Sequence, residues 1–494
     1  MITKKPLYIT TTLPYVNSEP HIGFAMEIIR ADVIVRYKKL LGYDVFFNTG
    51  TDEHGAKIFE NAAKAGITSQ EFVDVSSKKF KDMLITLAID PSVHFIRTTD
   101  EKHKKACVEM WNTCLAKGDI YKKQYKIKYC VGCELEKTDS ELVNDKCDLH
   151  PNRDIEIREE ENYFFKFSKY QQPLLDFYAK NQNFVIPDFR FNEIKSFVER
   201  GLEDFSISRL RTKMPWGVLV PNDEDQVMYV WFDALTNYIS TLDWKDGENF
   251  KKYWEQEGVE KREVIQYCGK DNLRQQSAMW QAMLMSAGLP QSTSIIIDGF
   301  ITGPNGIKMS KSLGNFIAPL EVIDVFKDVT DFPEDVLRFV LLHDISSFED
   351  GAMSLDSIKQ SYQSYLANGI GNLTNRVMKM ATSYGVSLKE EDKKMSVYGN
   401  GVEDFLLEKF DIAKRVDEIW SIITSIDEDI QRNQPFKKIK VNEEEAKNDL
   451  YKMLHNLLGV GFLLEPFMPR TSAKIIECVI ENKMPEKPLF NRLP

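Results

Sequence analysis

His21 and Gly23, together with Lys308 and Lys311, are the residues whose types and spacing best suit chemistry on a polyanion. An imidazole is a compact hydrogen-bond donor, and a glycine lets a phosphate or a purine approach the backbone closely. The two lysines stand on a stretch with glycines at both ends, where their ammonium groups could swing over a triphosphate. By itself the first pair could reflect simple packing, and the second could be a solvated basic turn.

A second set of residues has the types and spacing of a metal site. It consists of Cys130, Cys133, Cys147 and His150. Two residues separate the members of each pair, so both side chains of a pair can turn toward one ion. Three thiolates and one imidazole complete a closed tetrahedral Zn²⁺ site with no position open for water, which favours a structural zinc over a catalytic one. The alternative is four unrelated residues.

A strand followed by a helix must position His21 and Gly23. Residues 7–12 are apolar and β-branched without a breaker, which predicts a central strand that Pro14 ends. Apolar residues then recur at three- and four-residue spacing from Ile22 to Leu40, which predicts a helix that ends at Gly42. The first N–H groups of a helix lack intrahelical partners, so this N-terminus is a natural anion site.

A second predicted strand, Val45 to Phe47, leads into a polar stretch that contains Asp52. In open parallel sheets ligands bind outside the carboxyl ends of the strands, so Asp52 is placed to meet a small ligand. A carboxylate in that position suits an ammonium group. The simpler alternative is that Asp52 caps the helix predicted from Gly55 to Lys64.

The pattern along the chain predicts an α/β fold followed by a helical region. A strand-like apolar pattern returns at residues 228–238, and further strands are expected at 264–268 and 295–297. We therefore expect a Rossmann-like domain at residues 1–115 and 226–323, split by an insertion at 116–225 that carries the zinc residues. A connector at 324–362 and an α-helical bundle at 363–494 follow, with apolar stripes from Leu366 to Met380 and from Leu406 to Ile423.

The two polyanion motifs occur together as His21-Ile22-Gly23-Phe24 and Lys308-Met309-Ser310-Lys311-Ser312. This pair resembles the HIGH and KMSKS motifs of class I aminoacyl-tRNA synthetases, and it is far more specific than either half. The resemblance implies that His21, Lys308 and Lys311 stabilise the triphosphate of ATP as pyrophosphate leaves. The ATP contacts that it implies are His21, Gly23, Gly269, Asp271, Gly299, Lys308, Ser310 and Lys311.

Other stretches resemble the methionyl-tRNA synthetase family within that class. They include Thr-Leu-Pro-Tyr at residues 12–15 and Gly-Thr-Asp-Glu-His-Gly at 50–55. The resemblance implies that Asp52 holds the amino group of methionine and that aromatic residues surround the thioether. Aromatic rings make favourable contacts with its polarisable sulfur. The implied methionine-binding residues are Leu13, Tyr15, Asp52, Trp231, Ala234, Leu235, Tyr238 and Gln276.

The helical region resembles the anticodon-binding bundle of the same family. Gly371-Asn372-Leu373-Thr374-Asn375-Arg376 resembles its anticodon-reading helix, and Asn433-Gln434-Pro435-Phe436 resembles a second anticodon element. The implied anticodon contacts are Asn372, Arg376 and Phe436. A capped helix in an ordinary bundle is the alternative.

Three residues depart from the family pattern. Phe24 replaces the second histidine of the HIGH motif, Asp298 stands where the family has a histidine before Gly-Phe, and Gln276 stands where it usually has a pocket histidine. The first two put polar contacts to ATP in doubt, and the third concerns the methionine pocket.

Composition limits the classes of protein that fit. The chain has 494 residues and a net charge of −11, which argues against an indiscriminate nucleic-acid binder but allows a local basic track for tRNA. The start of the chain has no apolar signal region, and no apolar run is long enough to cross a bilayer, so we expect a cytoplasmic protein. We also expect a monomer, because nothing at the end of the chain resembles the dimerising domain of longer relatives.

The combined expectation is a ligase that joins L-methionine to tRNA(Met) through methionyl-adenylate, with ATP, Mg²⁺ for the phosphates and one structural Zn²⁺. A synthetase for another apolar or thiol amino acid is one alternative. A paralogue that binds tRNA without charging it is another, although Lys308 and Lys311 argue against it.

Overall fold

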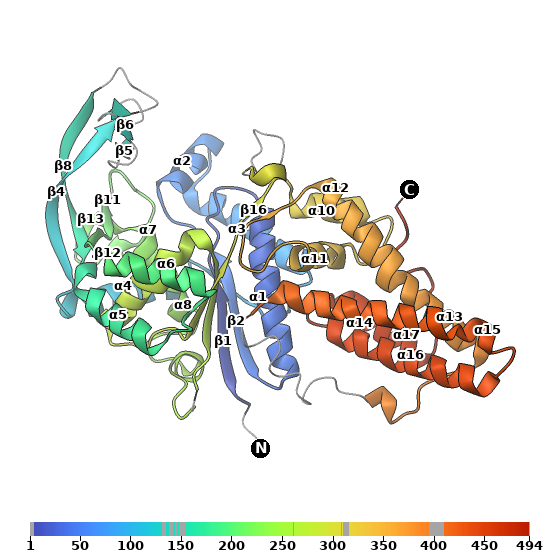
Figure 1. Ribbon diagram of the computed structural model, residues 1–494. Coiled ribbons are helices and arrows are strands. Elements are labelled where there is room, and N and C mark those ends of the chain that lie inside the picture. The colour runs from blue at the N-terminus through green and yellow to red at the C-terminus, as the bar shows by residue number, and fades with distance from the viewer. Residues whose placement is uncertain are drawn as a thin grey trace.

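The computed structural model describes residues 4–130, 135–137, 142–143, 146–147, 154–259, 261–307, 309, 316–394 and 410–493. Its central part is a parallel sheet, with a mostly β insertion on one side and a helical bundle on the other (Figure 1). The chain is therefore an α/β protein with an insertion and a helical C-terminal region, as the sequence predicts.

Six strands of the described residues form the central sheet, and every neighbouring pair is parallel. The strand order reverses direction between β1 and β14, because β2 and β3 lie on one side of β1 while β15 and β9 lie beyond β14. Such a switch point leaves a crevice at the carboxyl ends of the strands, where ligands bind in this class of sheet. The strands are β1 (Pro6–Thr11), β2 (Asp44–Thr51), β3 (His94–Arg97), β14 (Val264–Gly269), β15 (Ser294–Asp298) and β9 (Val185–Ile186).

The first strand and helix follow the sequence prediction closely. Helix α1 (Ile22–Leu40) follows β1 and ends just before Gly42, whose φ of 84° lies in the left-handed region that glycine tolerates. Strand β2 is longer than predicted and continues through Thr51, so Asp52 stands directly at its end. The residues Asn48 to Thr51 are polar, but both faces of a central parallel strand are buried, and pairing with β3 extends the strand.

Helix α1 is buried on nearly all sides rather than along one apolar stripe, because α11 (Pro333–His343) packs on it. Asp32 of α1 and Arg338 of α11 form an ion pair at 2.8 Å with both side chains fully buried. Arg30 donates further hydrogen bonds to the backbone carbonyls of Leu341 and Ile345. These contacts fix α11 and the segment that follows it onto α1.

The insertion is built on a long antiparallel pair, β4 (Ile120–Cys130) and β8 (Ile155–Phe165), which stands apart at the left of Figure 1. Both strands are longer than the short runs that the sequence indicates. Strand β9 lies between α5 and α6 of the same segment and pairs with β15, so the insertion also completes the edge of the central sheet. The remaining elements are β5 (Leu135–Lys137), β6 (Leu142–Val143), β7 (Lys146–Cys147), α5 (Gln171–Lys180), α6 (Asp188–Glu199), β10 (Phe205–Ser206), β11 (Ser208–Leu210), β12 (Leu219–Val220) and β13 (Asp223–Met228).

The strand-like pattern expected over residues 228–238 is wrong beyond Met228. The segment forms two short helices, α7 (Val230–Leu235) and α8 (Asn237–Ser240). Its aromatic and β-branched residues have strand propensity, but propensity is a weak preference that tertiary contacts override. Here the helical turn buries Asp233 completely, where two histidines bind it.

Helices α2 (Ala56–Ala65) and α3 (Ser69–Thr86) connect β2 to β3, and α9 (Trp280–Ala287) lies between β14 and β15 in the chain. Helix α4 (Glu101–Ala116) leads from β3 into the insertion. The short strands β16 (Ile301–Thr302) and β17 (Gly351–Ala352) pair in parallel, and α10 (Pro319–Phe326) lies between them in the chain. Among the helices of the described residues, none is long and apolar enough to cross a membrane.

The C-terminal region is helical, as predicted, and the stripe from Leu366 to Met380 is buried. Of the second stripe, Leu406 lies outside the described residues, and Phe410 precedes α14, which begins at Ile412, with a φ of 53°. Trp420 and Ile423 of the same stripe are buried. The segment after the last helix packs against the start of the bundle, where the hydroxyl of Tyr362 donates to the backbone carbonyl of Asn491 at 2.6 Å. The helices are α12 (Leu355–Ser361), α13 (Asn372–Tyr384), α14 (Ile412–Asn433), α15 (Pro435–Lys438), α16 (Glu443–Leu464) and α17 (Pro469–Glu481).

Candidate active site

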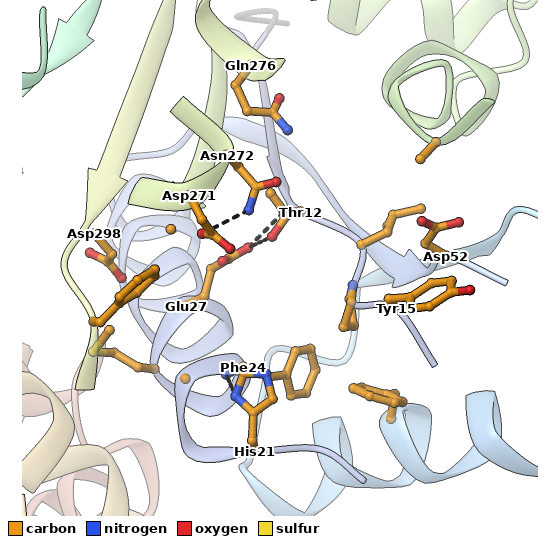
Figure 2. A pocket seen from close by; sticks show the side chains of 18 of the residues that line it. Thr12, Tyr15, His21, Phe24, Glu27, Asp52, Asp271, Asn272, Gln276 and Asp298 are labelled. Atoms are coloured by element: carbon orange, nitrogen blue, oxygen red, sulfur yellow. Dashed lines mark hydrogen bonds between the residues drawn. The ribbon is translucent and has the colours of Figure 1, made fainter. Parts of the chain in front are cut away.

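One cavity of about 420 Å³ lies at the carboxyl ends of β1 and β14, at the switch point of the sheet. Every described residue that the sequence assigns to ATP or to methionine lines it. These residues are Leu13, Tyr15, His21, Gly23, Asp52, Trp231, Ala234, Leu235, Tyr238, Gly269, Asp271, Gln276 and Gly299. Figure 2 shows His21, Asp52 and Gln276 on different walls around the same space.

His21 forms the N-terminal cap of α1. Its Nδ1 atom accepts a hydrogen bond from the backbone N–H of Phe24 at 3.2 Å, the bond drawn in Figure 2. Because Nδ1 acts as an acceptor, the neutral ring carries its proton on Nε2, which remains a donor for a ligand. Burial also lowers the pKa of His21, which favours this neutral form. The motif therefore offers an imidazole N–H beside the unpaired N–H groups of a helix N-terminus.

Gly23 is required by this cap. A Cβ at position 23 would lie 3.0 Å from Nδ1 of His21, so a larger residue would push the imidazole away. Phe24, which replaces a histidine of the family motif, is 7% exposed and packs edge-to-face on Phe80 of α3 at 5.1 Å. The ring thus forms an apolar wall where the family has a polar group.

Glu27 stands one turn further along α1 and also lines the cavity. The backbone N–H of Thr12 donates to Oε1 of Glu27 at 2.8 Å, and the Thr12 hydroxyl donates at 2.5 Å. Burial raises the pKa of Glu27 to about 8, and the nearby carboxylates of Asp298 and Asp271 act in the same direction. At neutral pH this carboxyl is mostly protonated, which lowers the negative charge that a polyanion would meet.

Asp52 forms a different wall of the cavity and is 7% exposed. The backbone N–H of Asp52 donates to Pro14 at 3.0 Å, and its carbonyl accepts from Val16 at 3.2 Å, so the loop after β1 holds it in place. Its Oδ1 atom is buried and has no hydrogen-bond partner among the described residues. Burial raises the pKa of Asp52 well above its usual range, and the charge of Asp233 adds to this. A cationic ligand would reverse the shift.

The alternative role for Asp52, as a helix cap, is excluded. The residue that caps α2 is Gly55, and no side chain accepts a hydrogen bond at that terminus. The Asp52 carboxylate accepts backbone hydrogen bonds from Glu53 and His54, and its unpartnered Oδ1 atom is left for a cationic group in the cavity.

A buried network lies next to Asp52 and was not predicted. Asp233 accepts from Nδ1 of His54 at 2.6 Å and from Nε2 of His103 at 2.8 Å. Burial alone would raise the pKa of Asp233, but the two imidazoles hold it well below its usual range. Cys107 lies 3.3 Å from the same carboxylate. Donor atoms of His103, Cys107 and Asp233 lie within 4.8 Å of one another, but hydrogen bonds already occupy them, so we assign them to positioning.

The wall at the far end from His21 contains Tyr238 and Gln276. Nε2 of Gln276 donates to the hydroxyl of Tyr238 at 2.5 Å, and the ring of Tyr238 packs edge-to-face on Trp280. Gln276 lies on a π-helical turn, Gln275–Met279, a distortion that is frequent at functional sites. Trp231, Ala234 and Leu235 of α7 complete this mostly apolar wall.

Asp298, the second departure from the family, is fixed by a buried pair. Its Oδ1 atom accepts from Arg30 at 2.9 Å and from the Tyr267 hydroxyl at 2.8 Å, while Oδ2 has no partner among the described residues. Gly299 beside it has a structural reason of its own, because a Cβ there would lie 2.3 Å from the backbone of Glu349. Gly299 lines the cavity, and its contact with ATP stays a prediction, while the chain that crosses it at Glu349 explains why the residue is glycine.

Several predicted residues lie outside the described part of the chain. Lys308, Ser310 and Lys311 are among them, as are Cys133 and His150. Cys130 and Cys147 end strands β4 and β7, and only their backbones are described.

The predicted anticodon residues lie in the helical bundle, away from the cavity. Asn372 and Arg376 lie one turn apart on α13, and Arg376 forms an ion pair with Asp427 of α14. Phe436 on α15 is 42% exposed, a high value for a phenylalanine, while Pro435 before it is buried. The absence of a side chain at Gly371 leaves room for the side chain of Phe490 and the carbonyl of Leu366.

Sequence reasoning missed Glu27 and the pair of histidines on Asp233. A glutamate within the apolar run of α1 was a usable signal for Glu27. No comparable signal exists for the network, since His54 and Asp233 are 179 residues apart in the chain.

Similarity to known proteins extends over nearly the whole chain. The chain matches the family described as tRNA synthetases class I (M) over residues 7–147 and 132–378. It is 38% identical to the methionine–tRNA ligase of Thermotoga maritima over 97% of this chain and 76% of that protein. It is 36% identical to the methionine–tRNA ligase of Rickettsia bellii over 98% of this chain and 94% of the relative.

A solved structure of Mycobacterium tuberculosis methionyl-tRNA synthetase in complex with methionyl-adenylate has the same fold. It superposes with a TM-score of 0.82 at 32% sequence identity, and the match covers 99% of this chain and 98% of that one.

Proposed function

The chain belongs to the methionyl-tRNA synthetase family of class I, and from this premise we propose that it activates L-methionine with ATP and charges tRNA(Met). Methionyl-adenylate and pyrophosphate form first, and the methionyl group then passes to the 3′ end of the tRNA. The product serves both the initiation and the elongation of translation.

The observation that carries this proposal is the arrangement of one cavity between β1 and β14. It has a buried carboxylate with one unpartnered oxygen, Oδ1 of Asp52, on one wall and a helix N-terminus capped by His21 on another. An amino acid that is bound by its ammonium group therefore meets a triphosphate in the same space. The carboxylate of methionine is itself the nucleophile toward the α-phosphorus, so the protein needs to supply position and charge stabilisation.

At the ATP wall, His21 donates from Nε2 toward phosphate oxygens while Nδ1 stays engaged with Phe24. This donor stabilises the negative charge that shifts to pyrophosphate as the bond to the α-phosphorus breaks. Gly269 ends β14 and Asp271 follows it, while Gly299 follows β15, where the ribose and base would lie. Lys308, Ser310 and Lys311 belong to the same set by their match to the family motif.

At the amino-acid wall, Asp52 accepts the ammonium group and becomes ionised as the cation arrives. Leu13, Tyr15, Trp231, Ala234 and Leu235 exclude water from the side chain, and Tyr238 with Gln276 closes the end. The geometry orients the substrate carboxylate toward the nucleotide wall.

Mg²⁺ fits this site as an ion that arrives with ATP. Among the described residues, no cluster of three carboxylates lines the cavity closely enough to hold a cation. Mg²⁺ keeps several waters and is usually bound through substrate phosphates and one or two carboxylates. When bound, it neutralises phosphate charge.

Zn²⁺ fits the donor set Cys130, Cys133, Cys147 and His150 in the insertion, because three thiolates and one imidazole make a closed structural site. Such a site leaves no position open for water or substrate, so the ion would shape the insertion. Elemental analysis of protein purified without chelators should give one zinc per chain. Cys147→Ala should lose the zinc, and retention of zinc by this variant would overturn the ligand assignment.

We propose that tRNA(Met) binds across the helical bundle, with Asn372 and Arg376 reading base edges of the anticodon and Phe436 stacking on an unpaired base. The exposed ring of Phe436 and its neighbours Lys437 and Lys438 support this placement. We still expect the protein to be a monomer in the cytoplasm. Sedimentation velocity with and without tRNA tests the oligomeric state.

Charging of tRNA tests the proposed function as a whole. The purified chain, ATP, Mg²⁺ and radiolabelled methionine should convert a tRNA with a CAU anticodon to an acid-precipitable product. The same tRNA body with an altered anticodon serves as the control. Tight tRNA binding without charging would identify the chain instead as a paralogue that does not aminoacylate.

A further inference from the structure

Three buried polar side chains continue behind the wall that Tyr238 and Gln276 form. They are Gln266 on β14, Gln281 on α9 and Ser292 just before β15, with exposed fractions of 1%, 0% and 2%. None of the three lines the cavity. Figure 2 shows the amide of Gln276, the last member of this series, at the cavity itself.

The backbone fixes the orientation of the first amide in the series. The backbone N–H of Ser292 donates to Oε1 of Gln281 at 3.1 Å, and Nε2 of Gln281 donates to the backbone carbonyl of Gln276 at 2.8 Å. A backbone N–H can only donate and a carbonyl can only accept. The oxygen and nitrogen of the Gln281 amide therefore cannot exchange places.

This orientation passes from Gln281 through two further side chains. Nε2 of Gln281 donates to the Ser292 hydroxyl at 3.3 Å, and that hydroxyl donates to Oε1 of Gln266 at 2.5 Å. Nε2 of Gln266 must then face outward, and it donates to Oε1 of Gln276 at 2.7 Å. Each group along the series has one role, set by the group before it.

At the cavity, the series ends in two hydrogen-bond donors, the amide nitrogen of Gln276 and the hydroxyl of Tyr238. Because Oε1 of Gln276 is held by Gln266, its Nε2 faces Tyr238 and donates to the phenolic oxygen at 2.5 Å. The Tyr238 hydroxyl thus acts as an acceptor toward Gln276 and keeps its own proton, for which the described residues provide no acceptor. A thioether accepts weakly and donates nothing, so donors are the matching groups for it.

We propose that Gln266 and Ser292 are positioning residues that determine specificity for a thioether side chain, by fixing Gln276 and Tyr238 as donors toward the substrate. The proposal rests on the proposed methionine activation. If every hydrogen bond in the series ran in the opposite direction, Gln276 would face Tyr238 with its amide oxygen. The Tyr238 hydroxyl would then donate its hydrogen bond to Gln276. The end of the cavity would then lose its donor and would accept a hydrocarbon side chain of equal size as readily as methionine.

Norleucine provides the test, because it replaces the sulfur of methionine with a methylene group. We expect Gln266→Leu to lower the ratio of kcat/KM for methionine to kcat/KM for norleucine by about fivefold, the worth of one modest hydrogen bond. The KM for ATP should stay unchanged, since neither residue touches the nucleotide wall. Ser292→Ala keeps the backbone bond to Gln281 and removes only the hydroxyl link, and it should change the ratio in the same direction.

Gln226→Leu is the matched control, because Gln226 is also buried and donates to a backbone carbonyl, but in the insertion. It should leave the ratio as in the parent. If Gln266→Leu yields no folded protein, the ratio measured for Ser292→Ala decides whether the proposal holds. An unchanged ratio in Ser292→Ala and in any folded Gln266→Leu overturns the proposal, as does an equal change in the control. A parent protein that activates neither amino acid would instead overturn the proposed function.

Discussion

The imidazole of His54 lies 2.6 Å from Oδ2 of Asp233, and both side chains are buried beside Asp52. Asp233 sits on α7, next to the residues that wall the cavity, whereas His54 follows β2 by only a few positions. The pair therefore ties the amino-acid wall to the end of a sheet strand. Nε2 of His103 on α4 donates to the other oxygen of the same carboxylate at 2.8 Å and completes the link.

Asp233→Asn should lower the free energy of unfolding by about 3 kcal/mol at neutral pH, because removal of one partner leaves buried groups unmatched. The folded pKa of Asp233 lies below the unfolded value of about 4, so its stabilisation is fully present above that pH and is lost as the pH falls further. Denaturant titrations at several pH values measure this, and the variant and parent should converge in acid. Asp243→Asn, at an exposed carboxylate, is the control and should change stability little.

His21→Asn should lower kcat for adenylate formation by about a hundredfold while the KM for methionine stays the same. Asparagine keeps the acceptor that caps α1 but places no N–H where Nε2 of His21 stands. His21→Ala should lose the same activity and, in addition, about 1 kcal/mol of stability from the cap. Pre-steady-state adenylate formation and thermal unfolding separate the two effects. Parental activity in His21→Asn would show that the ring serves only as a cap.

Glu27 predicts a dependence of ATP binding on pH. Its folded pKa of about 8 means that the carboxyl gains negative charge as the pH rises through that value. The KM for ATP should therefore increase between pH 7.5 and pH 9 in the parent, and it should stay flat in Glu27→Gln. Burial lowers the pKa of His21, so that ring titrates below this range and does not obscure the effect. An identical rise in both proteins would assign it to another group.

Phe436→Ala should reduce kcat/KM for charging a tRNA with a CAU anticodon by roughly fivefold or more, since base stacking contributes ~1–3 kcal/mol. Adenylate formation should be unaffected. Arg376→Ala should also relax discrimination against altered anticodons, because Arg376 can reach a base edge once it leaves Asp427. Val441→Ala removes another exposed apolar side chain nearby and should have no effect. If Phe436→Ala charged the tRNA at the rate of the parent under subsaturating conditions, the ring of Phe436 would serve packing within the bundle instead of stacking on a base.

The elements with strong local patterns could be predicted from the sequence. The β-branched run before Pro14 and the periodic helix that ends at Gly42 needed no tertiary information, and β1 and α1 match them. His21, Asp52 and Tyr238 could be assigned because they stand in motifs of a known family. The cavity confirms that these residues meet, but their contacts to ligands stay predictions.

What the sequence could not show depends on contacts between distant segments. The stretch after Met228 has strand composition, yet the burial of Asp233 against two histidines from other elements makes it helical. The orientation of the Gln276 amide depends on Gln281 and Ser292, and no local sequence pattern shows that these residues lie close together. The pKa of Glu27 likewise results from burial that becomes visible only in the folded chain.

The exchange of labelled pyrophosphate into ATP, measured without tRNA for each amino acid in turn, tests the central claim most directly. We predict that methionine supports the fastest exchange by a wide margin and that Asp52→Asn raises the KM for methionine far more than the KM for ATP. Faster exchange with leucine, isoleucine or cysteine, or exchange that Asp52→Asn leaves unchanged, would contradict the claim that this cavity joins methionine to ATP.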